Sequence, residues 1–296
     1  MNTSSVKVTQ LVFLFAALCL WPYVDTYVNN PDAFQYIGLA RHWTEGRWTE
    51  AVNGYWSPLL SWVLAPLLLT GVHPVLLFKG LQLFFALTAL GFWSRLVDIL
   101  LPSSRFNRWM KLTAIPLLLS QALLTLTADL LFVTVSLGML CFFLRGPVWS
   151  QRHRSLKAGA IGGLLYFSKA FGFPLFLVFS LVTFFHHRRT VASVGFKHLA
   201  AGMTLFFSLV GAWSVCISVK YGHVTISEAA AYNATRQVVG APGEIVQLPI
   251  LYDEGLSAPY GKHALSAWEE PMQSKPLEEL RPFVSDSDTV EWLSAI

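Results

Sequence analysis

Apolar and polar residues alternate in long blocks over the first 219 residues, and the chain is polar from Lys220 onward. The apolar blocks cover residues 8–24, 58–71, 75–101, 112–144, 158–185 and 199–219. A helix that crosses a bilayer needs about 17–25 consecutive, mainly apolar residues, and every block except 58–71 reaches that length. The pattern therefore predicts an all-α, polytopic membrane protein.

The composition supports the same class of protein. The chain is 54% hydrophobic and 13% charged, and its mean hydropathy is +0.51. Soluble domains carry about 25% charged residues. The net charge of +4 would suggest a nucleic-acid partner in a soluble protein. Here the basic residues lie in short segments between apolar blocks, where they indicate topology instead. No nucleic-acid partner is expected.

Twelve of the 21 basic residues gather at four places along the chain. They are Lys7; Arg95, Arg105, Arg108 and Lys111; Arg145, Arg152, Arg154 and Lys157; and Arg188, Arg189 and Lys197. Cytoplasmic loops of membrane proteins are enriched in lysine and arginine, so all four groups are assigned to the cytoplasmic side. The N-terminus is then cytoplasmic, and residues 220–296 form an extracytoplasmic segment.

This assignment decides which apolar blocks cross the membrane. Block 58–71 is too short to span and is expected to form a juxtamembrane or re-entrant helix on the outer side. Block 112–144 must turn back near Thr127–Asp129, since otherwise the later basic clusters would lie outside. Block 158–185 must turn back near Lys169–Pro174 for the same reason.

The expected architecture is a bundle of about seven transmembrane helices with juxtamembrane helices on the outer side. Residues 1–219 form this membrane module, and its first outer loop covers residues 25–74. Asp32, Asp129 and Lys169 all reach the outer face in this arrangement. The arrangement was derived from the basic clusters and not chosen to bring these three residues together. These three residues are therefore the first candidates for a functional site.

Asp32 follows the first apolar block and opens a short amphipathic helix beside the membrane. A carboxylate at this place can serve as the general base that removes a proton from an acceptor hydroxyl. The alternative is a structural role, because Asn30-Pro31-Asp32 is also a typical helix start with an acid that complements the helix dipole. Tyr36 shares the face of Asp32 and is a candidate to contact the acceptor, or else an interfacial aromatic residue.

The same helix carries an apolar stripe and a basic residue. Ala33, Ile37 and Ala40 form the stripe, which is expected to face the lipid. Arg41 is retained on the outer side against the general charge bias. It is a candidate to bind a lipid phosphate, and an ordinary headgroup contact is the alternative.

Asp129 and Lys169 lie where two long apolar blocks are expected to turn. An acid at the end of a transmembrane helix is uncommon and is by default a functional candidate. Asp129 is expected to position an acceptor or a cation, with a simple turn residue as the alternative. Lys169 is a candidate to neutralise a phosphate leaving group, or else a lysine that extends to the membrane interface.

Motifs of nucleotide-dependent and metal-dependent enzymes are absent from the sequence. It has no P-loop, no GxGxxG after a strand, no HExxH and no paired-cysteine metal motif. Cys19, Cys141 and Cys216 lie within apolar blocks and are expected to be small core residues. No cofactor is assigned on this basis, and a divalent cation remains an open option.

At these positions the chain resembles the GT-C glycosyltransferases, and in particular the branch of protein O-mannosyltransferases and lipid A aminoarabinose transferases. Their first outer loop carries a helix of the type D-E-x-x-Y-x-x-x-A-R. The matching residues here are Asp32, Tyr36, Ala40 and Arg41. The second acid of the family is Ala33 in this chain, which puts any metal that this acid binds in doubt.

Further positions follow the order of the family over residues 8–219. A Pro-Pro-Leu step that opens a juxtamembrane helix is represented by Ser57-Pro58-Leu59, with one proline lost. An acid that opens the fourth span corresponds to Asp129, and a lysine between spans five and six corresponds to Lys169. Family members usually continue with further spans, so the chain also fits the N-terminal part of a longer enzyme.

The resemblance implies transfer of a sugar from a polyprenyl-phosphate donor to an acceptor hydroxyl, with inversion, at the outer face of the bacterial inner membrane. It implies Asp32 as the base and Lys169 and Arg41 as donor phosphate ligands. It leaves Asp129 and Tyr36 to position the acceptor or a cation. The acceptor is a protein, a lipid or a glycan, and the sugar is open.

Two other functions remain open. A transporter or flippase of a lipid-linked sugar would use the same phosphate-binding residues without a base. A non-catalytic membrane scaffold would tolerate alanine at Asp32 and Lys169.

Overall fold

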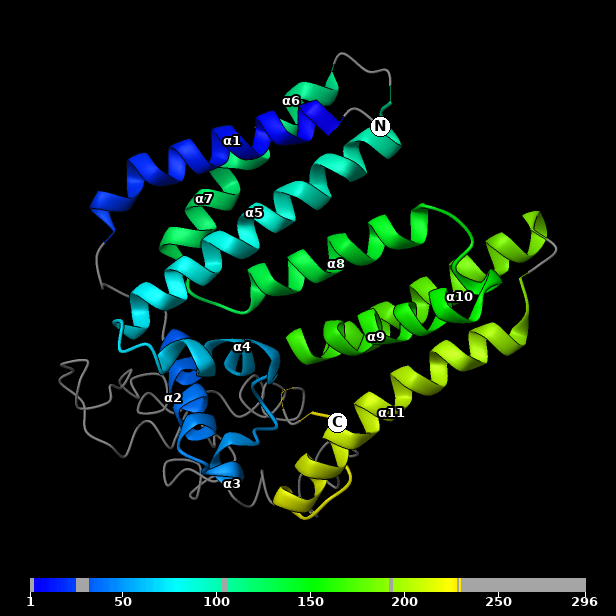
Figure 1. Cartoon of the computed structure of the whole chain (residues 1–296). Coiled ribbons are helices and arrows are strands. Elements are labelled where there is room, and N and C mark those ends of the chain that lie inside the picture. The colour runs from blue at the N-terminus through cyan, green and yellow to red at the C-terminus, as the bar shows by residue number, and fades with distance from the viewer. Residues whose placement is uncertain (1–2, 25–31, 103–105, 192–193, 228, 230–296) are drawn as a thin grey trace, which may run out of the picture. The chain divides into compact units, whose positions relative to one another are not determined.

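Figure 1 shows the computed structural model of the chain, which describes residues 3–24, 32–102, 106–191, 194–227 and 229. The described residues form helices, with no strand among them. In chain order the helices are α1 (Thr3–Leu20), η1 (Trp21–Tyr23), α2 (Asp32–Thr44), α3 (Trp48–Ala51), α4 (Leu59–Leu68), α5 (Pro74–Leu100), α6 (Phe106–Leu112), α7 (Ala114–Leu124), α8 (Asp129–Leu144), η2 (Val148–Ser150), α9 (Arg152–Ser168), α10 (Gly172–Thr190) and α11 (Phe196–Tyr221). The predicted all-α class is confirmed for this part of the chain.

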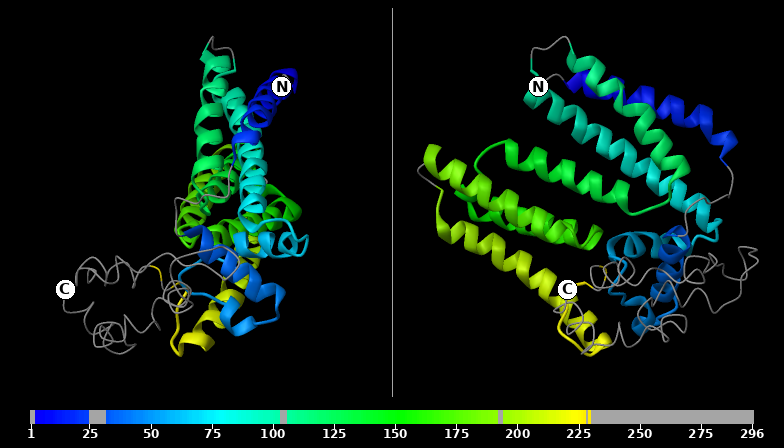
Figure 2. Two further views of the ribbon diagram at one scale, coloured as in Figure 1. Left: turned by 90° about the vertical axis from the view of Figure 1, so that its left-hand side faces the viewer. Right: turned by 180° about the vertical axis from the view of Figure 1, so that it is seen from behind.

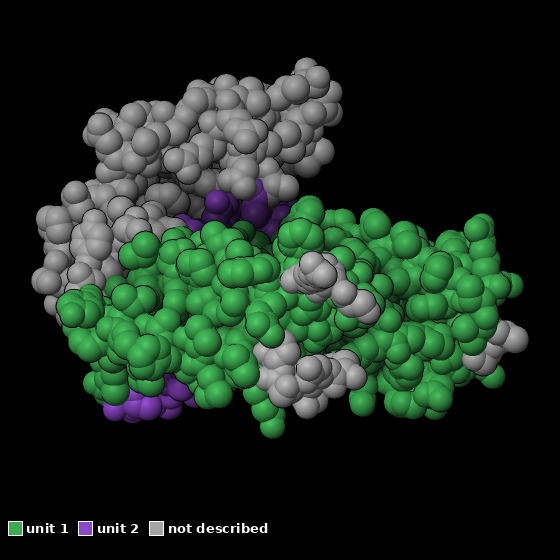
Figure 3. All heavy atoms as spheres, turned by 90° about the horizontal axis from the view of Figure 1, so that it is seen from above, with its two compact units in different colours: residues 1–30, 71–210 green, residues 31–70, 211–296 purple. Residues whose placement is uncertain are grey.

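The chain divides into two compact units, each made of two stretches of sequence (Figure 3). Unit 1 comprises Met1–Asn30 and Gly71–Val210, and unit 2 comprises Pro31–Thr70 and Gly211–Ile296. Helix α11 contributes its first part to unit 1 and its last turns to unit 2. Most of the predicted extracytoplasmic segment 220–296 lies outside the described residues, so that assignment stays a prediction.

Three helices among the described residues are long and apolar enough to cross a bilayer: Val6–Tyr23, Pro74–Leu100 and Phe196–Tyr221. They are compatible with an integral membrane protein. Helices α4 and α8 are apolar but shorter. The 16 residues of α8 cover about 24 Å, whereas the hydrocarbon core is about 30 Å thick. By this criterion the predicted count of seven spans is not confirmed.

The helices of unit 1 run alternately in opposite directions, as Figures 1 and 2 show. In chain order the antiparallel elements are α1, α5, the α6–α7 pair, α8, α9, α10 and the first part of α11. The connections α5–α6, α8–α9 and α10–α11, which carry the three later basic clusters, therefore lie at one end of unit 1. The connections α7–α8 and α9–α10 lie at the other end.

Both predicted turns are present. Helix α7 ends at Leu124 and α8 begins at Asp129, while α9 ends at Ser168 and α10 begins at Gly172. A proline is tolerated in the first turn of a helix, where Pro174 lies in α10. Glycine is needed at 172, because a Cβ there would lie 2.4 Å from the Leu165 carbonyl oxygen. The second turn therefore depends on close backbone contact between the ends of α9 and α10.

Close packing of α9 depends on its glycines. A Cβ at Gly159 would lie 2.2 Å from the carbonyl oxygen of Gly202 on α11, and a Cβ at Gly163 would lie 2.5 Å from Leu209. On another side of the helix, a Cβ at Gly162 would lie 2.7 Å from the Phe176 ring on α10. Small residues at such spacing let helices in membranes approach closely. These glycines hold α9, α10 and the first part of α11 together.

The cysteines do not all behave as expected. Cys141 is buried, but Cys19 and Cys216 are exposed, so the prediction of core positions is wrong for these two. The physical reason is that an apolar block contains a lipid-facing side as well as a core side. In the candidate span Val6–Tyr23 only 17% of the residues are buried inside the protein.

Candidate functional site

Asp32 is the first residue of α2 and is partly exposed. The amide groups of the first helical turn carry partial positive charge, which stabilises an ionised carboxylate at this position. This environment keeps the carboxylate in the ionised form that a general base needs, and a structural acid would use the same environment. The preceding Asn30 and Pro31 of the predicted helix start lie outside the described residues.

The stripe opposite Asp32 does not face lipid. Ala33, Ile37 and Ala40 are 0%, 1% and 0% exposed, so the predicted lipid contact is wrong. Helices α2 and α4 pack along each other within unit 2, and the Ser61 hydroxyl of α4 donates a hydrogen bond of 3.4 Å to the Tyr36 carbonyl of α2. The stripe is therefore part of the protein interior, and α4 is one of the elements packed against α2.

Tyr36 lies in a cluster of aromatic rings. It is 3% exposed, and its ring meets Trp56 edge to face, with the centroids 5.3 Å apart. The Tyr55 ring also meets the Trp56 ring edge to face, with the centroids 4.6 Å apart. A sugar therefore has no open Tyr36 ring face on which to stack. The proposed contact of Tyr36 with an acceptor stays a prediction.

Arg41 lies about two and a half turns along α2 and is also partly exposed. Burial lowers the pKa of the Arg41 guanidinium from its ordinary value, and the Glu45 carboxylate opposes this effect. An arginine in this situation remains charged at neutral pH. Glu45 also forms an ion pair with Arg47 at the surface. The last turn of α2 carries two basic residues, Arg41 and His42.

The sequence analysis did not predict the hydrogen bonds that join the end of α11 to the α3 segment within unit 2. The Lys220 ammonium donates hydrogen bonds to the carbonyl oxygens of Thr49, at 2.7 Å, and Val52, at 2.6 Å. It therefore caps the C-terminus of α3, where carbonyl groups lack helical partners. The Tyr221 hydroxyl accepts a hydrogen bond of 3.2 Å from the Gly54 amide. Sequence alone assigned Lys220 to the start of the polar tail, since its partners are about 170 residues away.

Lys220→Met is expected to destabilise the α3 segment by about 2 kcal/mol, because two carbonyl groups lose a charged donor. Hydrogen exchange of the amides of residues 48–54, measured by mass spectrometry on the detergent-solubilised protein, should become faster. Lys197→Met is the matched control, since Lys197 is an exposed lysine near the other end of the same helix. Equal protection in both variants would contradict the capping role.

Asp129 and Lys169 meet at one end of unit 1. The Lys169 ammonium donates to the Asp129 carboxylate and forms an ion pair with it. The two residues come from the tips of two different helical hairpins, and 46–48% of each side chain remains exposed. The sequence predicted both turns but did not predict that the two charges would pair.

The Asp129 carboxylate is oriented by a polar network. The Thr127 hydroxyl donates to its second oxygen at 2.9 Å, and the Thr127 carbonyl accepts a 2.5 Å hydrogen bond from Gln82 of α5. Gln82 is fully buried. The start of α8 is therefore tied to a buried residue of α5. The half-exposed Lys169, paired with Asp129, is held in a defined place where it can contact an anion.

The predicted site residues thus fall into two groups. Asp32, Tyr36 and Arg41 belong to α2 of unit 2, while Asp129 and Lys169 form the ion pair of unit 1. Across the described ranges, no group of three or more histidine, cysteine or acidic side chains is arranged to hold a metal ion.

Comparison of the chain with models of protein families, with curated proteins and with solved structures finds no match in any of the three. The class of protein is therefore defined by the structure alone. In the part of the chain that the structure describes, it is a helical protein with three candidate membrane-spanning helices, a lysine–aspartate pair at two hairpin tips and an acid at the N-terminus of α2.

Proposed function

We propose that the protein is a membrane glycosyltransferase that moves a sugar from a polyprenyl-phosphate donor to an acceptor hydroxyl. The observation that carries this proposal is the ion pair between Asp129 and Lys169 at the tips of two hairpins of apolar helices. A lysine held beside apolar helices and still half exposed is suited to the phosphate of a lipid-borne donor.

The reaction requires a base, an anion ligand and a leaving phosphate. Asp32 accepts the proton of the acceptor hydroxyl, and the oxygen attacks the anomeric carbon from the face opposite the phosphate. The bond from the anomeric carbon to the phosphate oxygen breaks, and its electron pair stays on the polyprenyl phosphate. Lys169 stabilises the negative charge that develops there, and Arg41 is a second candidate for this role.

Lys169 can keep its bond to Asp129 while it binds a phosphate. An ammonium group has three N–H donors, and the Asp129 carboxylate uses one of them. The remaining two can point to phosphate oxygens. Asp129 then acts as a positioning residue that fixes the ammonium in place, in addition to the acceptor or cation contact predicted from the sequence.

The proposed membrane arrangement has seven spans and a cytoplasmic N-terminus in the inner membrane of a bacterial cell. The basic connections at one end of unit 1 support this orientation, because such residues favour the cytoplasmic side. The Asp129–Lys169 pair, at the opposite end of the same unit, would then face the periplasm. The orientation is tested by placing single cysteines in the α7–α8 and α8–α9 connections and labelling the protein in spheroplasts with a reagent that does not cross the membrane.

The activity is tested with purified protein in detergent and a radiolabelled sugar on polyprenyl phosphate. Label moving to a hydroxyl acceptor supports the transferase. Label moving across the bilayer of reconstituted vesicles without transfer would favour a flippase. A protein that neither binds nor transfers the donor would leave only the scaffold.

Lys169→Gln is expected to lower transfer about a hundredfold, because the leaving phosphate loses a charged ligand. The folded state should change by no more than about 1 kcal/mol, since an ion pair as exposed as this one contributes little stability. Initial rates at saturating acceptor, together with thermal unfolding in detergent, separate these two effects. Lys157→Gln, which removes an exposed lysine near the other end of α9, is the control that should retain full activity. A parallel loss in both variants would reject a specific role for Lys169.

A further inference from the structure

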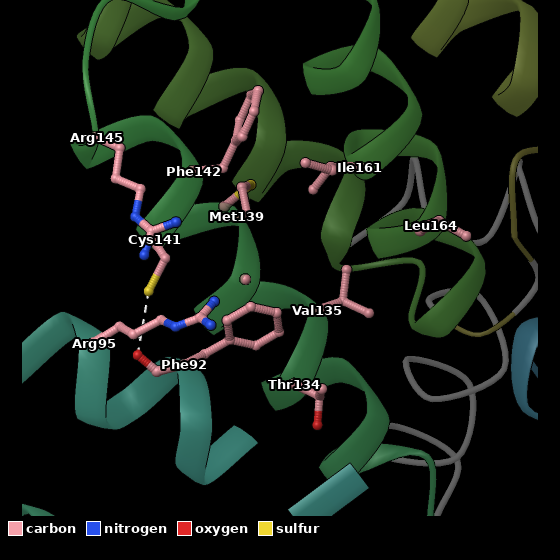
Figure 4. Close-up of a pocket in the computed structure, with 11 residues that line it drawn as sticks. Phe92, Arg95, Thr134, Val135, Met139, Cys141, Phe142, Arg145, Ile161 and Leu164 are labelled. Atoms are coloured by element: carbon pink, nitrogen blue, oxygen red, sulfur yellow. Dashed lines mark hydrogen bonds between the residues drawn. The ribbon is translucent and has the colours of Figure 1, made fainter. Parts of the chain in front are cut away.

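A cavity in unit 1 is separate from the proposed site. It has a volume of about 360 Å³ and lies between α5, α8 and α9. Figure 4 shows apolar side chains along most of its wall, among them Phe92, Met139, Phe142 and Ile161. A cavity of this size and lining is of the kind that holds a small apolar ligand or part of a larger one.

Two arginines lie on the same cavity. Arg95 comes from α5 and Arg145 directly follows the last residue of α8, and Figure 4 shows their guanidinium groups extending to one side of the cavity, near Cys141. No acidic residue is found among the described side chains that line it. The lining therefore combines an apolar wall with a doubly positive end.

The acid nearest to Arg95 along α5 is already engaged. Asp98 accepts hydrogen bonds through one carboxylate oxygen from Lys111, at 2.6 Å, and Asn107, at 3.0 Å. Lys111 is buried and forms an ion pair with Asp98, so this carboxylate neutralises Lys111. Two arginines are among the residues that line the cavity, and an anionic ligand would complement their charge.

The position along α8 distinguishes the arginine end of this cavity from the donor site. Asp129 opens α8, whereas Arg145 follows its last residue, so the two lie about 24 Å apart along the helix axis. The arginines are at the end of unit 1 that carries the basic connections. The headgroup of a lipid in the adjacent leaflet would reach this end, while its acyl chain entered the apolar part.

We infer that the cavity between α5, α8 and α9 binds an anionic phospholipid, with the phosphate on Arg95 and Arg145 and acyl-chain carbons against the apolar wall. The ligand class follows from the lining. Free phosphate would leave the apolar wall of the cavity without a partner, whereas an acyl chain fits it. The two guanidinium groups favour an anionic over a zwitterionic headgroup. The site is independent of the proposed sugar transfer.

Native mass spectrometry of the full-length protein in detergent tests this site. The probes are dioleoyl phosphatidylglycerol and dioleoyl phosphatidylcholine, which have the same acyl chains and different headgroup charge. The wild type should retain phosphatidylglycerol in preference. The double variant Arg95→Gln/Arg145→Gln should weaken its binding about thirtyfold, from the loss of two cationic contacts. The control Arg152→Gln/Arg189→Gln removes two exposed arginines outside the cavity and should bind as the wild type does.

A second variant keeps both arginines and tests the apolar part. Leu164 lines the cavity and is 43% exposed, so Leu164→Trp should narrow the cavity and weaken phosphatidylglycerol binding even though the charges remain. Equal retention of the two lipids by the wild type, or an equal loss in the control variant, would overturn the inference. A larger loss of polyprenyl phosphate than of phosphatidylglycerol in Arg95→Gln/Arg145→Gln would also overturn it, since the cavity would then belong to the carrier lipid.

Discussion

Asp32→Asn should lower sugar transfer about a thousandfold while the protein still folds and still binds the donor. Asparagine has nearly the same shape as aspartate but cannot accept the proton of the acceptor hydroxyl at neutral pH. Asp32 is partly exposed at the first position of α2, so its replacement leaves the packing of α2 on α4 unchanged. Transfer rates and donor binding, each measured on the purified variant, give the two readouts.

Two further variants separate a base from a structural acid. Asp32→Glu keeps the carboxylate and should retain part of the activity. Glu50→Gln removes an exposed acid from the neighbouring helix α3 and should change nothing. A clear drop in the melting temperature of Asp32→Asn, alongside the loss of transfer, would favour the helix-start interpretation. Unchanged transfer in the same variant would remove Asp32 from the catalytic role.

Gly159→Ala should destabilise the protein by about 3 kcal/mol or more. The added Cβ would lie 2.2 Å from the backbone carbonyl oxygen of Gly202. A backbone atom cannot rotate away as a side chain can, so α9 and α11 would have to separate. Thermal unfolding in detergent, followed by intrinsic fluorescence, should show a lower midpoint.

Gly211→Ala provides the matched comparison for this variant. Gly211 lies on α11, and a Cβ there would meet nothing within 4 Å. Because alanine has a higher helix propensity than glycine, this second variant should be neutral or slightly more stable. Similar midpoints for the two variants would mean that α9 and α11 do not depend on close contact at Gly159.

The two hairpin tips show which features local sequence patterns can predict and which they cannot. The ends of α7 and α9 were predicted near Thr127–Asp129 and near Lys169–Pro174, and both breaks are present. Chain direction, apolar length and the positions of basic residues are local or statistical properties, so a single sequence contains them. The ion pair between Asp129 and Lys169 adds a contact across 40 residues that no local pattern specifies.

The α2 stripe shows the opposite case. Its alanines and isoleucine are equally compatible with a lipid-facing and a protein-facing surface, because both environments are apolar. Tertiary packing decided between them, and Ala33 and Ala40 are completely buried. The same ambiguity accounts for the exposed Cys19 and Cys216, which lie in apolar blocks but on surfaces without a protein neighbour.

Sequence by itself determined the helical class, the blocks apolar enough to meet a membrane, the two reversals and the identity of the charged residues at them. These follow from side-chain polarity and helical length alone. Tertiary structure decided which apolar faces meet protein, that Lys220 caps α3, that Gly159 touches Gly202 and that Arg95 and Arg145 share one cavity. Each of these depends on which distant segments pack together, and packing is set by shape complementarity between surfaces that look alike in composition.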